Sequence, residues 1–331
     1  MKEYTAPRFP AAPRPTRAAV LGLAAVGAAS VLPLHAQTAS RLVVGIAAID
    51  GSIGPLVGLR AGIFKRHGLD VELAVMNSGA ALSAAVIGGS IAVAATNVVG
   101  LISAHAKGVP LQIVAPAGIY RSEKPAEALV VRRDSPIASG ADFSGKTIAS
   151  SALGDLDSLA CLAWIDAHGG NSDLVRRVEL PPAATAAALV AGRVDGAALQ
   201  EPRLSEALQA GQVRVLGDEY AAVARRFIVS AMVAAGEAAT ANRDVMMRYA
   251  RAQLEANVYA NAHHDETARW LAELANVDVE SIARAPRKEF AESLDLALIR
   301  PLVDVTLRYK VITRAFDPRE LISPAVASLL S

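Results

Sequence analysis

Four consecutive residues in the last third of the chain offer a dense set of side chains capable of chemistry. His263, His264, Asp265 and Glu266 supply two imidazoles and two carboxylates, the groups found in metal sites and in general acid–base catalysis. Adjacent residues of a helix point in different directions, and we expect this run in the middle of a long amphipathic helix. We therefore interpret it as a solvated helix surface.

Other reactive side chains also lack the surroundings that catalysis needs. GDLDS, residues 154–158, resembles part of a calcium loop but has neither its glycine turn nor its distal glutamate. Cys161 is the only cysteine and lies among apolar residues at helical spacing, so we expect a buried packing thiol. The sequence contains no G-x-S-x-G, phosphate loop or H-E-x-x-H motif. We predict no enzyme, no metal and no cofactor.

The first 36 residues have the composition of a secretory signal peptide. Basic residues precede an apolar run, residues 18–34, and Ala36 offers a small residue at a cleavage point. The run contains Pro33 and falls short of the ~20 residues that a membrane span needs, which favours export over anchoring. We expect cleavage near Ala36 and a periplasmic mature protein.

Length and composition indicate two α/β domains. A chain of 331 residues is long enough for two. Hydrophobic residues make up 53% but aromatic residues only 4%, and small aliphatic side chains allow helices to pack closely on sheets. The formal net charge is +1 and the charges are mixed, which argues against a nucleic-acid or membrane-surface partner.

Alternating strand and helix patterns predict a parallel sheet. Apolar stretches such as residues 42–47 and 69–76 alternate with helical stretches four times before residue 120. Continuous apolar strands with crossover helices form parallel sheets, and the loops at their carboxyl ends form a ligand crevice. In this chain those loops are residues 48–54, 77–79, 96–97 and 116–121.

One stretch of the sequence occurs twice in similar form, and we call it the repeated phrase. AALSAAVIGGSIAVAAT, residues 80–96, returns as AATAAALVAGRVDGAAL, residues 183–199, with Gly89 aligned to Gly192. Each copy predicts an Ala-rich helix, a left-handed glycine that ends it, and a short buried strand. Two copies predict two sheets of similar construction.

The last part of the chain changes character. After residue 243 helices dominate, and residues 287–311 predict a helical stretch bent or broken at Pro301. We expect these helices to pack on the first lobe, so that the chain crosses between lobes near residues 121–127 and 227–233. Two crossings make a hinge, and the space between the lobes makes a cleft.

Four stretches, spread in order over nearly the whole mature chain, carry a resemblance to a known family. They are GPLVGLRAGIFKRHGLDVELAVMNSG, KPAEALVVRRDSPIASGADFSGKTIA, LPPAATAAALVAGRVDGAALQEP and RAFDPRELIS. The chain resembles the periplasmic substrate-binding proteins of ABC importers, in the nitrate/sulfonate/taurine (SsuA-like) and NMT1/THI5-like group. The resemblance implies an α/β fold, the type II periplasmic binding protein, with two doubly wound lobes and a two-segment hinge. Lobe 1 would comprise residues 41–122 and 232–331, and lobe 2 residues 123–231.

The same resemblance implies a solute-binding component of an importer. Its partners would be a small-molecule ligand and an ABC permease with its ATPase, and the protein itself would be a monomer. A THI5-like enzyme of pyrimidine synthesis is an alternative, but that enzyme uses a Cys-rich iron-binding motif, which one cysteine cannot supply. A ligand-sensing subunit of a membrane receptor shares the fold and remains open.

The resemblance also implies ligand contacts from strand-end loops of both lobes. In the first lobe these are Asp50, Ser52, Ser78, Gly79, Thr96, Asn97, Tyr120 and Arg121. In the second lobe they are Gly154, Asp155, Leu156, Glu201 and Pro202. The family often places hydroxyl and glycine residues where this chain reads LGDLD.

Carboxylates in these loops bear on the choice of ligand. Helix amino-terminal ends attract anions, but Asp155 and Asp157 stand near one such end, and Asp50 and Glu201 lie in other crevice loops. Carboxylates in these places would satisfy the amides and repel a small anion. We therefore hypothesise an organic ligand with amine, amidine, ring-nitrogen or hydroxyl donors, such as a pyrimidine-like, taurine-like or zwitterionic molecule. The other interpretation is structural: both aspartates cap the helix, Tyr120 packs, and Arg121 is a solvated charge near the hinge.

Overall fold

The structure of the protein is a computed structural model that describes residues 39–76 and 79–330. The signal peptide expected over residues 1–36 and the predicted contact Ser78 lie outside the described residues. Among the residues that are described, no helix combines the length and the apolar character that a membrane crossing requires.

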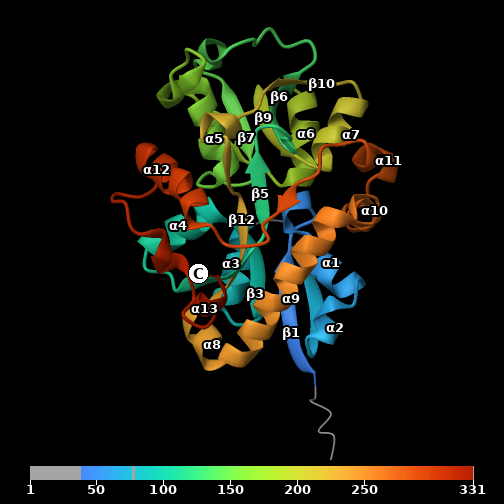
Figure 1. The fold of residues 1–331 in the computed structure, drawn as a ribbon. Coiled ribbons are helices and arrows are strands. Elements are labelled where there is room, and N and C mark those ends of the chain that lie inside the picture. The colour runs from blue at the N-terminus through green and yellow to red at the C-terminus, as the bar shows by residue number, and fades with distance from the viewer. Residues whose placement is uncertain (1–38, 77–78, 331) are drawn as a thin grey trace, which may run out of the picture. The chain divides into compact units, whose positions relative to one another are not determined.

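The first five-stranded sheet has the order β2-β1-β3-β12-β4. Its strands β1, β3 and β12 are labelled in Figure 1. β1 pairs in parallel with β2 and β3, as the alternating pattern predicts. β12 comes from much later in the chain and pairs antiparallel with both β3 and β4, an insertion that the sequence pattern does not predict. The strands are β1 (Ser40–Ile46), β2 (Leu69–Val75), β3 (Val93–Asn97), β4 (Leu111–Pro116) and β12 (Ser230–Ala235).

Short helices connect these strands. Pro55 lies in the first turn of α1, where its missing amide costs no hydrogen bond. Asn97, the last residue of β3, caps α4 by accepting a hydrogen bond from the Gly100 amide at 2.7 Å. The helices are η1 (Asp50–Ser52), α1 (Gly54–Arg60), α2 (Ile63–Arg66), α3 (Gly79–Ile87) and α4 (Val98–Ala106).

The second five-stranded sheet has the order β10-β6-β9-β7-β8. Its strands are β6 (Glu127–Arg132), β7 (Thr147–Ser150), β8 (Arg176–Glu179), β9 (Gly196–Gln200) and β10 (Val213–Gly217). Its helices are η2 (Gly140–Phe143), α5 (Leu156–Ala167), η3 (Ser172–Leu174), α6 (Pro182–Val190), α7 (Arg203–Gln209) and η4 (Tyr220–Ala222).

The two sheets have the same plan, which explains the repeated phrase. In each, the strand of the phrase (β3 or β9) lies between a parallel strand (β1 or β7) and an antiparallel one (β12 or β6). Val93 pairs with Val44, and Gly196, its partner in the repeat, pairs with Ile148. The glycines that end the two helices, Gly89 and Gly192, have φ of +73° and +69°, a region that glycine enters without steric cost. The predicted construction of the repeat is confirmed.

A three-stranded antiparallel sheet holds the segments next to the two predicted crossings. β5 (Gly118–Arg121) pairs with β11 (Arg226–Ile228) on one side and with β13 (Glu289–Phe290) on the other. The chain thus passes through this small sheet each time it leaves one five-stranded sheet for the other. The division into two lobes at residues 122 and 232 stays a prediction.

The C-terminal segment is mostly helical, with two differences from the expectation. Residues 287–295 contain β13 instead of helix, and Pro301 lies in the first turn of a helix instead of bending one. His263 lies at the junction of two helices, so the placement of the His263–Glu266 run in mid-helix is wrong. The helices are α8 (Gly236–Ala241), α9 (Arg243–Ala262), α10 (His264–Ala275), α11 (Val279–Ala283), η5 (Leu296–Leu298), α12 (Arg300–Arg308), η6 (Pro318–Leu321) and α13 (Ala327–Leu330).

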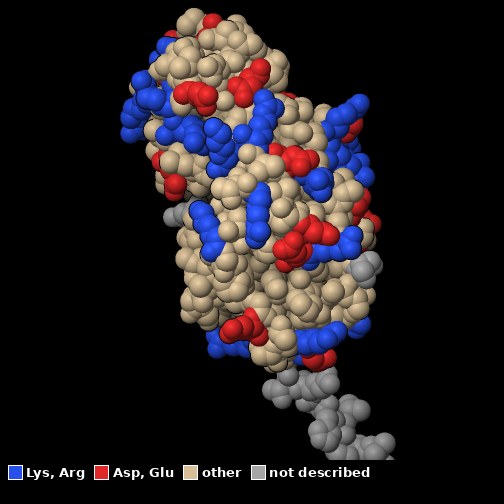
Figure 2. Space-filling model, turned by 90° about the vertical axis from the view of Figure 1, so that its left-hand side faces the viewer, with Lys and Arg blue, Asp and Glu red and all other residues tan. Residues whose placement is uncertain are grey.

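Charged side chains of both signs share the face drawn in Figure 2. Lys and Arg gather across its upper part with Asp and Glu among them, and much of the lower part is uncharged. A face of this kind lacks the uninterrupted basic surface that is typical of nucleic-acid-binding proteins.

Candidate functional site

A cavity of about 70 Å³ lies where strand ends from both five-stranded sheets come together. β3 contributes Thr96 and Asn97, and β9 contributes Gln200. The loop after β1 adds Ser52, and the loop after β7 adds Ser151. These are the carboxyl ends of parallel strands, where ligands of open α/β sheets bind.

Six of the residues predicted from the sequence line this cavity. They are Ser52, Gly79, Thr96, Asn97, Asp155 and Leu156. Six others do not line it: Asp50, Tyr120, Arg121, Gly154, Glu201 and Pro202.

Asp50 is buried in an ion pair that leaves it no role in the cavity. The Nε and Nη2 atoms of Arg287 lie 3.0 and 2.7 Å from Asp50 Oδ1, and the Lys288 amide donates to Oδ2 at 2.6 Å. The two side chains are only 7% and 2% exposed. Asp50 therefore holds the loop after β1 to the segment that precedes β13.

Tyr120 and Arg121 also have structural partners. The Tyr120 hydroxyl donates to Asp218 at 2.6 Å, and its ring packs against Tyr220 and Phe227. Burial raises the pKa of the Tyr120 phenol, and its bond to the Asp218 carboxylate adds to this rise. Arg121 forms a partly exposed ion pair with Glu289 at 2.5 Å. Both side chains strengthen the small antiparallel sheet and its surroundings.

Glu201 is turned away from the cavity. Its carboxylate accepts hydrogen bonds from the Ser205 hydroxyl at 2.8 Å and the Ser205 amide at 3.1 Å, in the first turn of α7. Burial raises its pKa to about 7, although the Ser205 donors oppose the shift. Glu201 and Pro202 are joined by a cis peptide bond.

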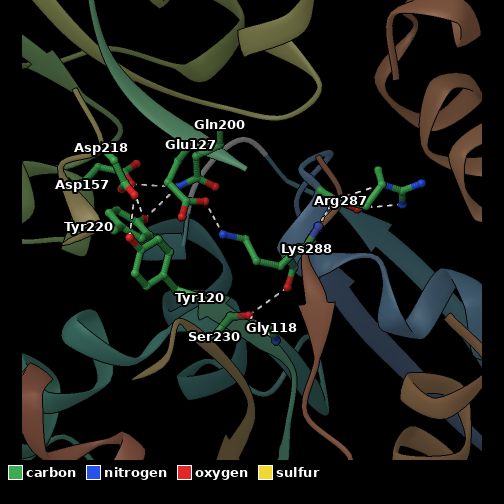
Figure 3. Close-up of polar contacts among 12 residues, drawn as sticks. Gly118, Tyr120, Glu127, Asp157, Gln200, Asp218, Tyr220, Ser230, Arg287 and Lys288 are labelled. Carbon is green, nitrogen blue, oxygen red and sulfur yellow. Dashed lines mark hydrogen bonds and ion pairs between the residues drawn. The ribbon is translucent and has the colours of Figure 1, made fainter. Parts of the chain in front are cut away.

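Two carboxyl groups from the start of α5 do line the cavity. Asp155 accepts a hydrogen bond from the Ser158 amide at 2.9 Å, which caps α5, and another from the Ser151 hydroxyl. Asp157 accepts from the Tyr220 hydroxyl at 2.6 Å and from Gln200 Nε2 at 2.7 Å, both on Oδ1 (Figure 3). The capping role expected of Asp155 is present, but that expected of Asp157 is wrong, because Asp157 bonds across to β9 and η4.

The surroundings of the pair disfavour two negative charges. Asp155 and Asp157 are 4% and 5% exposed. Burial, and then the nearby Asp157 charge, raise the pKa of Asp155 to about 8, while the Ser151 and Ser158 donors oppose the rise. Within the described part of the chain, neither carboxylate forms an ion pair. The wall contributed by the second sheet is therefore anionic.

The opposite wall is neutral. Thr96 is 5% exposed and its hydroxyl has no hydrogen-bond partner among the described residues. The Asn97 side chain uses Oδ1 as a helix cap, which leaves its amide nitrogen without a partner there. The Ser230 hydroxyl, by contrast, donates to the Gly51 carbonyl and accepts from the Gly118 amide. Neutral donors and acceptors thus face the carboxyl pair across the cavity.

Comparison with known proteins assigns the chain to a family. The family model described as NMT1/THI5 like matches residues 51–267, which is more than half of the chain. The protein belongs to the NMT1/THI5-like family. None of the curated proteins compared with it matches.

Solved structures similar to this NMT1/THI5-like protein identify its fold. The periplasmic aliphatic sulphonate binding protein SsuA from Escherichia coli is 24% identical, with a TM-score of 0.69, 86% of this chain and 97% of that chain covered. The periplasmic nitrate-binding protein NrtA from Synechocystis PCC 6803 is 14% identical, with a TM-score of 0.74 and coverages of 88% and 89%. The desulfurization enzyme DSZB is 16% identical, with a TM-score of 0.64 and coverages of 87% and 98%. The predicted family and the periplasmic binding-protein fold are both confirmed.

The sequence interpretation of this NMT1/THI5-like chain missed five polar residues of the cavity. They are Ser151, Gln200, Tyr220, Ser230 and Lys288. A signal for Gln200 existed: in the repeat it takes the place of Asn97, and each residue ends its strand at the cavity. Tyr220 begins the three-residue helix η4, and Lys288 lies in the loop before β13, so neither belongs to an element long enough to leave a pattern.

Lys288 is the one cation that lines the cavity within the described chain, and it is already paired. Its Nζ bonds to Glu127 Oε2 on β6, with the two side chains 4% and 0% exposed. Nζ also lies 5.5 Å from the centre of the Tyr220 ring. Figure 3 shows Lys288 reaching toward Glu127, while the adjacent Arg287 points the other way. Burial raises the pKa of Glu127, and Lys288 opposes this rise.

The other candidate groups lie apart from the cavity. Cys161 is buried, and burial raises the pKa of its thiol well above the usual range. In the described segments, no group of three or more His, Cys, Asp and Glu side chains is arranged to hold a metal ion. His263 stacks on Tyr259 with ring centres 3.8 Å apart, as expected for a helix-junction side chain.

Proposed function

We propose that this protein is the solute-binding component of an ABC importer and captures a small, nitrogen-bearing organic nutrient. The observation that carries the proposal is the cavity with Asp155 and Asp157 on one wall and Thr96 and Asn97 on the other. Amine, amidine or ring-nitrogen donors of a ligand would bond to the carboxyl pair. Hydroxyl or carbonyl groups would bond to the neutral wall.

The same wall argues against a bare inorganic anion. A helix amino-terminal end binds an anion through free amides and the helix dipole. At the start of α5 the Ser158 amide already donates to Asp155, and two carboxyl groups occupy the space nearby. A sulfonate would have to bind at the neutral wall, with its amine or ring directed at the carboxyl pair.

Capture would require only differential binding to open and closed forms. Lobe 1, residues 41–122 and 232–331, and lobe 2, residues 123–231, would move about the strands β5 and β11, and the ligand would bridge them. A micromolar dissociation constant corresponds to about −8 kcal/mol, which a handful of hydrogen bonds in a closed cavity can supply. The closed form would then be presented, as a monomer in the periplasm, to the permease.

Binding without chemical change distinguishes this role from catalysis. The fold by itself does not decide, because an enzyme, DSZB, is among the similar structures. In this chain the carboxyl pair faces neutral groups, and Cys161 is buried away from the cavity. We expect any ligand to be recovered unchanged after prolonged incubation with the protein, as checked by mass spectrometry.

The proposal is tested by calorimetric titration of the purified protein. The panel contains aminopyrimidine precursors of thiamine, taurine, alkanesulfonates and nitrate. We expect one of the organic compounds to bind in the micromolar range and nitrate not to bind. Nitrate binding with no organic ligand contradicts the proposed ligand class, and no binding at all contradicts the proposed function.

A further inference from the structure

Two carboxyl groups and one hydroxyl meet at the start of α5. The Ser151 hydroxyl makes a short hydrogen bond with Asp155 Oδ2 and lies 3.5 Å from Asp157 Oδ2. A serine hydroxyl has one hydrogen, so it cannot donate to both carboxylates at once. Two buried carboxylates that both lie near one hydroxyl repel each other, and a proton on one of them removes the repulsion and adds a donor.

The arrangement indicates which carboxyl carries that proton. Asp157 Oδ1 accepts from two donors, Tyr220 and Gln200, so the hydrogens at this oxygen are supplied by its neighbours. Asp155 receives backbone donors from Ser158, on Oδ1, and from Ala152, and its Oδ2 faces Ser151, whose hydroxyl oxygen can accept. A proton on Asp155 Oδ2 therefore satisfies all of the contacts.

The titratable groups facing the pair add no positive charge. Tyr220 and Glu219 face it from η4 and the loop before it, Glu127 from β6, and Cys161 from the next turn of α5. Glu219 is fully buried, and neither of its carboxyl oxygens has a hydrogen-bond partner among the described residues.

The surrounding cations bond to other groups. Lys288 is paired with Glu127, and Arg203 with Glu206 and the Ala275 carbonyl. Arg177 of β8 donates to the Leu153 carbonyl and the Ser158 hydroxyl. The remaining charged groups on elements packed against α5 also point elsewhere. Arg308 of α12 pairs with Asp166, and His105 of α4 pairs with Glu320. Asp142 of η2 and Asp173 of η3 are exposed.

Building on the proposed function, we propose that Asp155 and Asp157 share one proton in the empty cavity and release it to solvent when a small organic monocation binds. An amidinium or a protonated amine has the required charge. The cation replaces the proton as the group that offsets the second carboxylate, and Thr96 and Asn97 bond to the neutral part of the ligand.

Proton exchange makes the affinity depend on pH. Burial and the Asp157 charge raise the pKa of Asp155 to about 8, so the empty cavity holds its proton at neutral pH. Below that value, a ligand that expels one proton binds about tenfold more tightly for each unit of rising pH. A neutral ligand that leaves the proton in place shows no such dependence.

Three planar molecules of nearly the same size and shape differ in charge, so comparing them tests the effect of ligand charge on affinity. Acetamidinium is positive, acetamide is neutral and acetate is negative. The purified protein is titrated with each of them in two buffers that differ in their enthalpy of ionisation, which yields the number of protons released. We expect acetamidinium to bind most tightly and release about one proton, with a tenfold gain in affinity per unit between about pH 6 and pH 7.5.

Matched variants locate the proton. Asp155→Asn keeps a side-chain oxygen to cap α5 but removes the titrating carboxyl. Asp278→Asn makes the same change at the exposed cap of α11, outside the cavity. We expect Asp155→Asn to release no proton, to match the parent near pH 5.5, and to bind acetamidinium at least tenfold more weakly at about pH 7.5. Asp278→Asn should behave like the parent.

Several results would overturn this inference. They are acetamidinium binding without proton release, proton release that persists in Asp155→Asn, tighter binding of acetate, or no acetamidinium binding at tens of millimolar. Each of them leaves the proposed function intact provided that a nutrient of the first panel binds. The function itself fails only when the whole nutrient panel fails.

Discussion

The loop after β1 and the loop after β7 occupy equivalent places in two sheets of the same plan, yet their aspartates differ in role. Asp50 in the first loop is paired with Arg287 and with a backbone amide. Asp155 and Asp157, in and just after the second loop, have no cation within ion-pairing distance in the described chain. Equivalent positions therefore form a buried ion pair in one sheet, Asp50 with Arg287, which we call the Asp50 clamp, and an anionic cavity wall in the other. The difference depends on whether a distant segment of the chain supplies a cation.

The largest expected effect comes from breaking the clamp. Arg287→Met leaves Asp50 buried with one backbone donor, and loss of one partner of a buried pair costs about 3–5 kcal/mol. Urea unfolding measures the loss. The control is Arg284→Met, whose exposed pair with Glu280 should change stability by less than about 1 kcal/mol. Similar losses in the two variants would show that the Asp50 clamp contributes no more to the free energy of unfolding than an exposed ion pair does.

The anionic wall should give the protein a pH-dependent stability that the clamp does not. The folded pKa of Asp155, about 8, lies above the unfolded value of ~3.9. The folded state therefore binds the extra proton between these values, and stability falls as pH rises through this window by about 1.4 kcal/mol per unit.

Asp155→Asn should remove that contribution. Between about pH 5.5 and pH 7.5 the parent should lose about 3 kcal/mol more than the variant. Glu201 and the other buried carboxyls titrate in both proteins, so the difference between the two unfolding curves isolates Asp155. Parallel curves would mean that Asp155 is already ionised in the empty protein.

A smaller effect is expected at Tyr120, which lies behind the anionic wall and not in it. Tyr120→Phe removes the bond to Asp218 and should cost about 1 kcal/mol in thermal or urea unfolding. Because Tyr120 does not line the cavity, ligand affinity should change by less than about twofold. A large loss of affinity with unchanged stability would indicate that Tyr120 contacts the ligand, as the sequence predicted.

The smallest effect is expected at Arg121. Its pair with Glu289 is 34% and 39% exposed, so solvent and salt screen it. Arg121→Gln should cost less than about 1 kcal/mol at low salt and nothing measurable at high salt. A cost that persists at high salt would place Arg121 in the same class as Arg287.

Most of the fold could be predicted from the sequence because local patterns specify it. Apolar strands, helix caps and left-handed glycines are properties of neighbouring residues, and the repeated phrase predicted both β3 and β9. The insertion of β12 between β3 and β4 was not accessible, since it depends on pairing between strands far apart in the chain. β13 is too short to leave a pattern.

The candidate site could be predicted in part, for the same reason. Thr96, Asn97 and Asp155 follow or end strands, so the rule for parallel sheets brings them to one edge. Asp50 follows the same rule, and nothing near it in the sequence indicates that Arg287 will neutralise it. Tyr220 enters the cavity from a helix of only three residues and Lys288 from a loop, where no periodicity places them.

The amino-acid sequence by itself determined the two similar sheets, the sheet edge that holds the candidate site and the family. The tertiary structure alone decided which of the carboxylates at that edge are neutralised. The reason is physical: secondary structure follows from neighbours along the chain, whereas the charge of a buried site depends on every group within a few ångströms. The cation that neutralises Asp50 lies 237 residues further along the chain.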